Sequence, residues 1–88
     1  MTRVAIATFL TVLATPVLAN PNCTDEPKGK WLSETAMKDK VAEHGYKFRV
    51  FKVTKGNCYE IYGHDKNGAR VEVYFHPVTG AIVKEVKS

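Results

Sequence analysis

The second half of the chain is a regular series of short runs in which apolar and polar residues alternate. The runs cover residues 46–53, 58–64, 69–76 and 81–86, and the segments between them, residues 54–57, 65–68 and 77–80, are rich in residues that favour turns. Such alternation is typical of strands with one buried face, and turns this short join antiparallel neighbours. The pattern therefore predicts a four-stranded antiparallel β-meander.

Turn geometry gives the expected alignment of neighbouring strands. The turn at residues 65–68 suits a type I turn with a left-handed glycine, which aligns two apolar pairs on one face, Ile61 with Val73 and Tyr59 with Phe75. A four-residue loop at 54–57 sets Val50 opposite Ile61, on the same face. The last hairpin has two reasonable alignments, either Val73 opposite Val83 or Phe75 opposite Ile82.

A single short helix is expected before the strands. Ser33 is a good N-cap residue, and Glu34 follows it at the positive end of the helix dipole. Leu32 and Met37 have the spacing of a hydrophobic staple. The helix should end near residue 44, because Gly45 supplies a left-handed stop. We therefore predict an α+β fold, in which one N-terminal helix packs on one face of the four-stranded antiparallel sheet.

The other face of the sheet has no helix to cover it. Strand alternation sends to this open face the side chains of Glu60, Tyr62, Glu72, Tyr74 and His76. Tyrosines among charges suit protein recognition, although strands favour tyrosine in any case. These five residues are our candidate partner-binding surface.

The N-terminus has the features of a secretory signal peptide. Arg3 supplies the positive charge, residues 4–18 are uncharged, and residues 17–19 form a small-residue cleavage site. The apolar run is shorter than the ~20 residues of a spanning helix and Pro16 interrupts it, so we expect cleavage, with no membrane insertion afterwards. The expected organisation is a signal peptide at 1–19, a polar lead-in at 20–30 and one domain at 31–88, located in the periplasm.

Cys23 and Cys58 are the only cysteines, and in an exported chain such a pair predicts one disulfide. Cysteines of a redox or metal pair would be close in sequence, whereas these are far apart. A domain below ~70–80 residues needs such a staple, which should stabilise it by roughly 3–4 kcal/mol. The bond would also lay the lead-in, together with Trp31, across one end of the open face.

Charge and reactive side chains exclude several function classes. The net charge is +4, and the lysines are scattered rather than arranged in a stripe that would follow a phosphate backbone, so we expect no nucleic-acid binding. The hydroxyl groups lie at a cap, in turns or near the chain ends, without a positioned base. Glu60 and Glu72 are expected to be solvated rather than catalytic. The chain is therefore not expected to be an enzyme, and no cofactor is implied.

The three histidines are the remaining candidates for a site. His44 is expected at the helix end, where an imidazolium complements the dipole, and His64 is expected opposite Arg70. A metal or haem needs convergent ligands, whereas the expected alignment places His64 and His76 at opposite ends of the central hairpin. Structural or solvated histidines are the simpler interpretation, and a haem- or metal-binding domain that uses His76 or His64 is the alternative function.

Several short motifs in a fixed order resemble those of the PepSY domain family, named for peptidase propeptides and YpeB. They are Leu32-Ser33-Glu34 with Met37 and Lys38, Gly45-Tyr46, Cys58-Tyr59-Glu60-Ile61-Tyr62, the turn at 65–68, and Val71-Glu72-Val73-Tyr74-Phe75 followed by Pro77-Val78-Thr79-Gly80. The resemblance covers roughly residues 31–86. It implies a helix on an antiparallel sheet, a bacterial periplasmic or cell-surface setting, and inhibition or regulation of peptidases. The family commonly has an acidic residue at the position of His76. An imidazole there weakens any role that is carried over for that carboxylate as a turn acceptor.

Together these features predict a non-catalytic periplasmic module that regulates a protein partner through its open sheet face or an edge strand. The expected partner is a peptidase or a membrane protein. The module itself is expected to be a monomer or a weak dimer.

Overall fold

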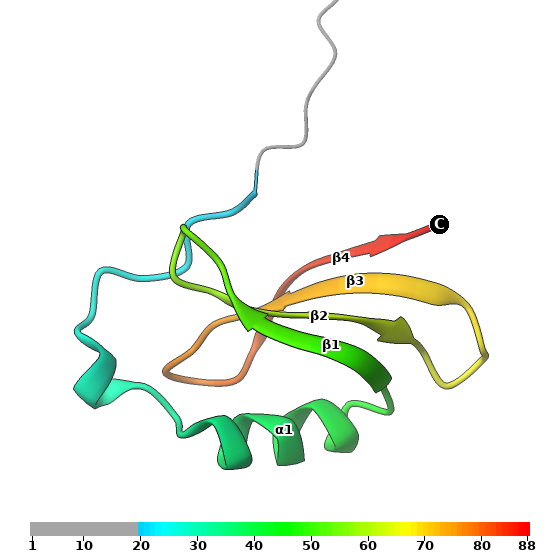
Figure 1. The fold of residues 1–88 in the computed structure, drawn as a ribbon, viewed down its shortest axis with the longest axis horizontal. Coiled ribbons are helices and arrows are strands. Elements are labelled where there is room, and N and C mark those ends of the chain that lie inside the picture. The colour runs from blue at the N-terminus through cyan, green and yellow to red at the C-terminus, as the bar shows by residue number, and fades with distance from the viewer. Residues whose placement is uncertain (1–19) are drawn as a thin grey trace, which may run out of the picture.

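The protein is described here by a computed structural model that covers residues 20–88, so the predicted signal segment at 1–19 lies outside the described residues. The elements in chain order are the 3₁₀ helix η1 (Lys28–Lys30), the helix α1 (Glu34–Glu43) and the strands β1 (Lys47–Val53), β2 (Tyr59–His64), β3 (Arg70–Phe75) and β4 (Ile82–Lys87). The strands form one antiparallel sheet in the order β1-β2-β3-β4, and α1 lies along one face of it (Figure 1). The predicted α+β fold is confirmed. Within residues 20–88, no helix is long and apolar enough to cross a membrane.

α1 begins and packs as the sequence predicts. The Ser33 hydroxyl accepts a hydrogen bond from the Ala36 N–H at 3.1 Å, which satisfies one of the free amides at the helix start. Met37 and Val41 are fully buried, one helical turn apart on the same side of the helix. They belong to one cluster with sheet side chains, namely Tyr59, Ile61, Val71, Val73 and Phe75. The core therefore lies between α1 and the sheet.

The central hairpin has the predicted alignment, with Ile61 opposite Val73 and Tyr59 opposite Phe75. In the last hairpin, the pair of Phe75 with Ile82 is the one that forms. The register shifts between Tyr74 and Phe75, so that Val83 lies between two paired positions. Beyond this bulge Val73 pairs with Glu85, so the alternative alignment of Val73 with Val83 does not occur.

The predicted alignment of the first hairpin is wrong by one residue. Ile61 lies opposite Phe51 instead of Val50. The loop has three residues rather than four, because Thr54 still pairs with Cys58: the Thr54 N–H donates to the Cys58 carbonyl at 2.9 Å. A one-residue change reverses which side chains face the core, so Phe51 packs against the core and Val50 turns to the open face.

A bulge in β1 then returns Phe48 to the core side. The register shifts between Phe48 and Val50, which makes Arg49 the extra residue. Here β1 passes very close to Gly63 of β2, where an added Cβ would lie 1.9 Å from the Lys47 carbonyl oxygen. Only a glycine permits this approach of the two backbones.

The predicted disulfide between Cys23 and Cys58 is present, with a Cα–Cα distance of 5.1 Å. It holds residues 20–23 on the side of the sheet opposite α1, near the loop between β1 and β2 (Figure 1). The Cys23 N–H donates to the Gly56 carbonyl at 2.8 Å. A Cβ on Gly56 would lie 2.2 Å from the Pro21 carbonyl oxygen, so the loop and the lead-in are in direct contact. The lead-in therefore crosses one end of the open face, as predicted.

Trp31 does not join the lead-in on the open face, and that part of the prediction is wrong. Its indole packs edge-on against Tyr59, with 5.5 Å between ring centroids, on the side of the sheet that faces α1. Its ring N–H donates to the Glu26 carbonyl at 3.0 Å. Trp31 therefore extends the core instead of covering the open face.

Candidate functional site

The strand pairs place the predicted surface residues together on the open face. Glu60 lies opposite Tyr74, and Tyr62 lies opposite Glu72 in the next row. The lead-in divides this face into two parts. We call the part that contains Glu60 and Tyr74, beside residues 20–23, the covered half. The part that contains Tyr62 and Glu72 is the uncovered half.

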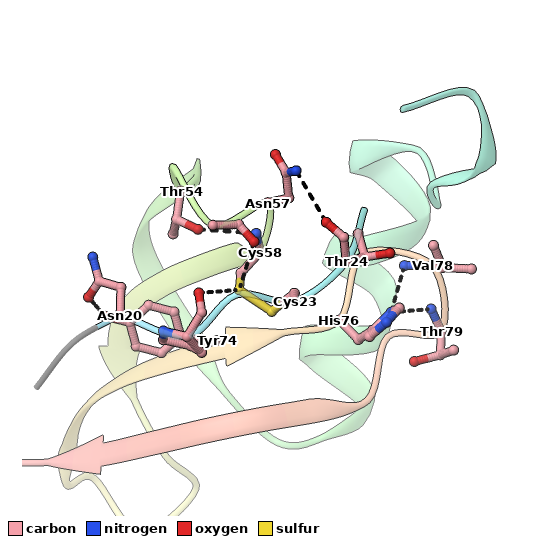
Figure 2. The surroundings of a disulfide bond; sticks show 12 residues. Asn20, Cys23, Thr24, Thr54, Asn57, Cys58, Tyr74, His76, Val78 and Thr79 are labelled. Carbon is pink, nitrogen blue, oxygen red and sulfur yellow. Dashed lines mark hydrogen bonds between the residues drawn. A yellow bond between two sulfur atoms is a disulfide. The ribbon is translucent and has the colours of Figure 1, made fainter. Parts of the chain in front are cut away.

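Tyr74 is buried in the covered half. Its hydroxyl donates to the Asn20 side-chain Oδ1 at 2.9 Å, and the side chain lies against the lead-in beside the disulfide (Figure 2). Only 5% of its surface is exposed. Burial raises the pKa of Tyr74 to about 12, and the nearby Glu60 carboxyl acts in the same direction. Tyr74 therefore anchors the lead-in and offers a partner little surface.

Glu60 is the second buried residue of the covered half, and the expectation that it is solvated is wrong. Only 2% of its surface is exposed. Its Oε1 lies 3.8 Å from the Lys52 ammonium, whereas its Oε2 is buried and has no hydrogen-bond partner among the described residues. Burial raises the pKa of Glu60 and the neighbouring Glu72 carboxylate adds to the rise, although Lys52 acts against it. The carboxyl group can therefore keep a proton at a higher pH than an ordinary glutamate.

His76 takes part in the turn that follows β3. Its ring Nδ1 accepts hydrogen bonds from the backbone amides of Val78 and Thr79, at 3.2 and 3.4 Å (Figure 2). These contacts require the proton of the neutral ring to be on Nε2. The imidazole thus accepts hydrogen bonds in this turn, at the position where the resemblance assigns an acidic residue.

The three histidines lie apart from one another. His64 pairs with Arg70 at the far end of the central hairpin from His76, as expected. The His44 ring stacks against Phe75 on the helix side, and its Nε2 lies 3.4 Å from the Gly80 carbonyl oxygen. In the described part of the chain, no three His, Cys, Asp or Glu side chains are placed to share a metal ion.

The uncovered half contains a hollow of about 210 Å³. Its lining combines two arginines, a histidine, a carboxylate and a tyrosine: the residues are Arg49, Tyr62, Gly63, His64, Arg70, Val71, Glu72 and Ser88. Two of the five predicted surface residues, Tyr62 and Glu72, therefore line a concave site. The Lys52 ammonium lies over the Tyr62 ring at 4.8 Å and donates to its hydroxyl at 2.9 Å, which holds this side chain in place.

Arg49 is a site residue that the sequence did not reveal. It reaches the hollow because the β1 bulge removes it from the regular alternation, and a strand pattern alone assigns it to a face without showing the bulge. The available signal was Gly63, since an isolated glycine within a strand marks a bulge or a close backbone approach.

The two outer strands expose apolar side chains at the edges of the sheet. β1 and β4 form its edges, and their exposed apolar side chains are Val50, Val53, Ile82, Val83 and Val86. An edge strand presents unpaired N–H and C=O groups that another extended chain can pair with. The sheet therefore offers a partner both a concave face and main-chain hydrogen bonds.

These features define a small disulfide-bonded α+β domain with a helix on one face of its sheet and a half-open opposite face. The family model described as peptidase propeptide and YPEB domain matches residues 3–86, and the chain belongs to this family, PepSY, as the resemblance indicated. Membership supports a regulatory module of the peptidase-propeptide kind in general, and such a module is consistent with a protein that is not an enzyme. Comparison with curated proteins and with solved structures gave no significant match.

Proposed function

We propose that this protein is a non-catalytic periplasmic module that binds and regulates a protein partner through the uncovered half of its open sheet face. The observation that supports this surface is the concave site at Tyr62 and Glu72, which are paired across β2 and β3 on the open face of the sheet. Aromatic and arginine side chains are the residue types enriched at protein interfaces. A peptidase is the first expected partner, since the family is named for peptidase propeptides.

The uncovered half is a better docking surface than the five-residue set as a whole. Glu60 and Tyr74 are buried beside the lead-in, and the His76 ring accepts hydrogen bonds within its own turn. A partner would therefore contact Tyr62 and Glu72 directly. The exposed edges of β1 and β4 provide room for an extended partner segment beside them.

Site-specific photo-crosslinking in the native periplasm tests this surface. A photoreactive residue at Tyr62 or Glu72 should give a covalent adduct with a distinct protein, identified by mass spectrometry. The matched control is the same residue at Thr35 or Asp39, two exposed positions on α1. Adducts from the α1 positions, with none from the sheet positions, would show that the proposal assigns binding to the wrong face.

A direct assay follows for any peptidase that is captured. Its rate on a peptide substrate should change when the purified module is added, and the change should disappear with the double variant Tyr62→Ala and Glu72→Arg. The control variant Thr35→Ala and Asp39→Arg should keep the full effect. An unchanged rate with every captured peptidase would remove peptidase regulation from the proposal.

A further inference from the structure

The hollow of the uncovered half has an uneven charge arrangement. Arg49 and Arg70 line it from β1 and β3, and Glu72 contributes the one acidic side chain. Arg49 and Arg70 are both exposed. Within residues 20–88, neither guanidinium group makes an ion pair or a side-chain hydrogen bond. Two cationic groups at one small hollow therefore keep their hydrogen-bond donors available.

What sets these arginines apart is that they line one hollow, since Lys30 and Lys55 also make no ion pair within residues 20–88. Three lysines of the described chain pair with carboxylates, at N–O distances from 2.9 to 3.8 Å: Lys38 with Glu34, Lys52 with Glu60, and Lys87 with Asp65. The carboxylate that lines the hollow with the two arginines, Glu72, pairs with neither of them. The fold thus brings two guanidinium groups to one hollow, and within residues 20–88 neither forms an ion pair with an anionic group.

A specific backbone feature produces this arrangement. Arg49 lines the hollow because it is the extra residue of the β1 bulge, and that bulge requires a glycine at position 63. The bulge therefore positions a guanidinium group beside Tyr62, whose ring is itself held by Lys52. The Tyr62 ring therefore lines the hollow, and Lys52 holds this ring in place.

The size and charge of the hollow limit the chemistry of its ligand. At about 210 Å³ it is smaller than the ~300 Å³ at which sites for whole small molecules begin, so it suits a single side chain or chain end. A guanidinium group matches a carboxylate with two parallel hydrogen bonds. Glu72 in the lining repels a multiply charged anion and can accept a hydrogen bond from a peptide N–H.

We infer that this hollow binds a carboxylate of the partner polypeptide between Arg49 and Arg70, with Glu72 receiving an N–H of the same segment. This inference rests on the proposed function and adds the chemistry of the partner, an extended acidic segment. The carboxylate has two sources, an Asp or Glu side chain or a free C-terminus, and the experiment separates them.

The test is a titration of the isotope-labelled, disulfide-bonded protein with three peptides of six residues, followed by nuclear magnetic resonance. The first is capped at both ends and contains two glutamates, the second is its capped glutamine counterpart, and the third is the glutamine peptide with a free C-terminal carboxylate. We expect the amides of Tyr62, Gly63 and Arg70 to shift with the first peptide or the third, and not with the second.

Charge-matched variants separate a specific site from general attraction. The double variant Arg49→Gln and Arg70→Gln should weaken binding at least tenfold, because it removes both charge-assisted donors. The control Lys30→Gln and Lys55→Gln removes the same charge from exposed positions outside the hollow, and it should weaken binding less than twofold.

Two results would overturn the inference: shifts that are equal for all three peptides, or equal losses in the two double variants. Neither result would affect the crosslinking test at Tyr62. The carboxylate site can therefore be refuted while the docking surface stands.

Discussion

Glu60 gives the sharpest physical prediction, because the fold buries a carboxyl group that it does not fully satisfy. The Oε2 atom has no hydrogen-bond partner among residues 20–88, and the Oε1 atom is 3.8 Å from Lys52. An unsatisfied buried polar group costs about 1–3 kcal/mol. The ion pair offsets little of this, since the Lys52 side chain is exposed and its ammonium is screened by water. The cost is greater for a charged group, and Glu60→Gln keeps the shape of the side chain while removing its charge, so it should stabilise the domain at neutral pH by about 1–2 kcal/mol.

The pH dependence of that gain follows from the raised pKa of Glu60. The folded state keeps the proton to a higher pH than the unfolded chain does, so the wild-type protein loses stability as pH rises from the ordinary glutamate value, about 4.3, through the folded value. Glu60→Gln has no such loss. The free-energy difference between the two proteins should thus be smallest in acid, grow with pH, and become constant above the folded pKa.

Urea unfolding measured from acid to neutral pH checks this prediction, and each kcal/mol should also raise the melting temperature by about 4–8 °C. Glu26→Gln is the control, since it removes an exposed carboxylate that does not act on Glu60 and should change stability by less than about 0.5 kcal/mol. A Glu60→Gln variant that is less stable than wild type at neutral pH would refute the reasoning. So would a difference that does not vary with pH.

Two further variants probe the framework around the site. Replacing both Cys23 and Cys58 with serine opens a link across a sequence separation of 35 and should lower stability by about 3–4 kcal/mol; identical melting of the variant and the oxidised protein would contradict this. Gly63→Ala should cost about 1–3 kcal/mol or more, because the new Cβ would lie 1.9 Å from the Lys47 carbonyl oxygen, and calorimetry should show no comparable loss for Gly29→Ala, where nothing lies within 4 Å.

Local signals in the sequence were sufficient for much of the fold. The start of α1 depends on the hydroxyl of Ser33, and the central hairpin depends on one short turn and on alternation within two strands. The predicted alignment of the first hairpin was wrong because Thr54 is a residue type common in loops. In the structure it pairs with Cys58 and so shortens the loop. That pairing is decided by the contacts of the whole loop, which composition does not encode.

The sequence was sufficient to predict which sheet face carries the candidate site residues, but not which of them are exposed. Alternation correctly placed Glu60 and Glu72 on the same side of the sheet. It could not show that only Glu60 is buried, because Glu60 lies in the half of the face beside the lead-in, where Asn20 contacts Tyr74 from far away in sequence. Arg49 was missed for a related reason, since a bulge depends on the neighbouring strand as well as on its own.

The lead-in contacts also have a kinetic consequence. Asn20 and Tyr74 are 54 residues apart, and Cys23 and Cys58 are 35 apart, whereas the hairpins join neighbouring strands through short loops. Closing a long loop takes more entropy, so we expect the sheet to form first and residues 20–23 to pack on it last. During that interval Glu60 and Tyr74 would be open to solvent. Alkylation of free thiols at successive times of oxidative refolding, alongside the intrinsic fluorescence of Trp31, would measure the interval, and disulfide closure ahead of sheet formation would contradict this order.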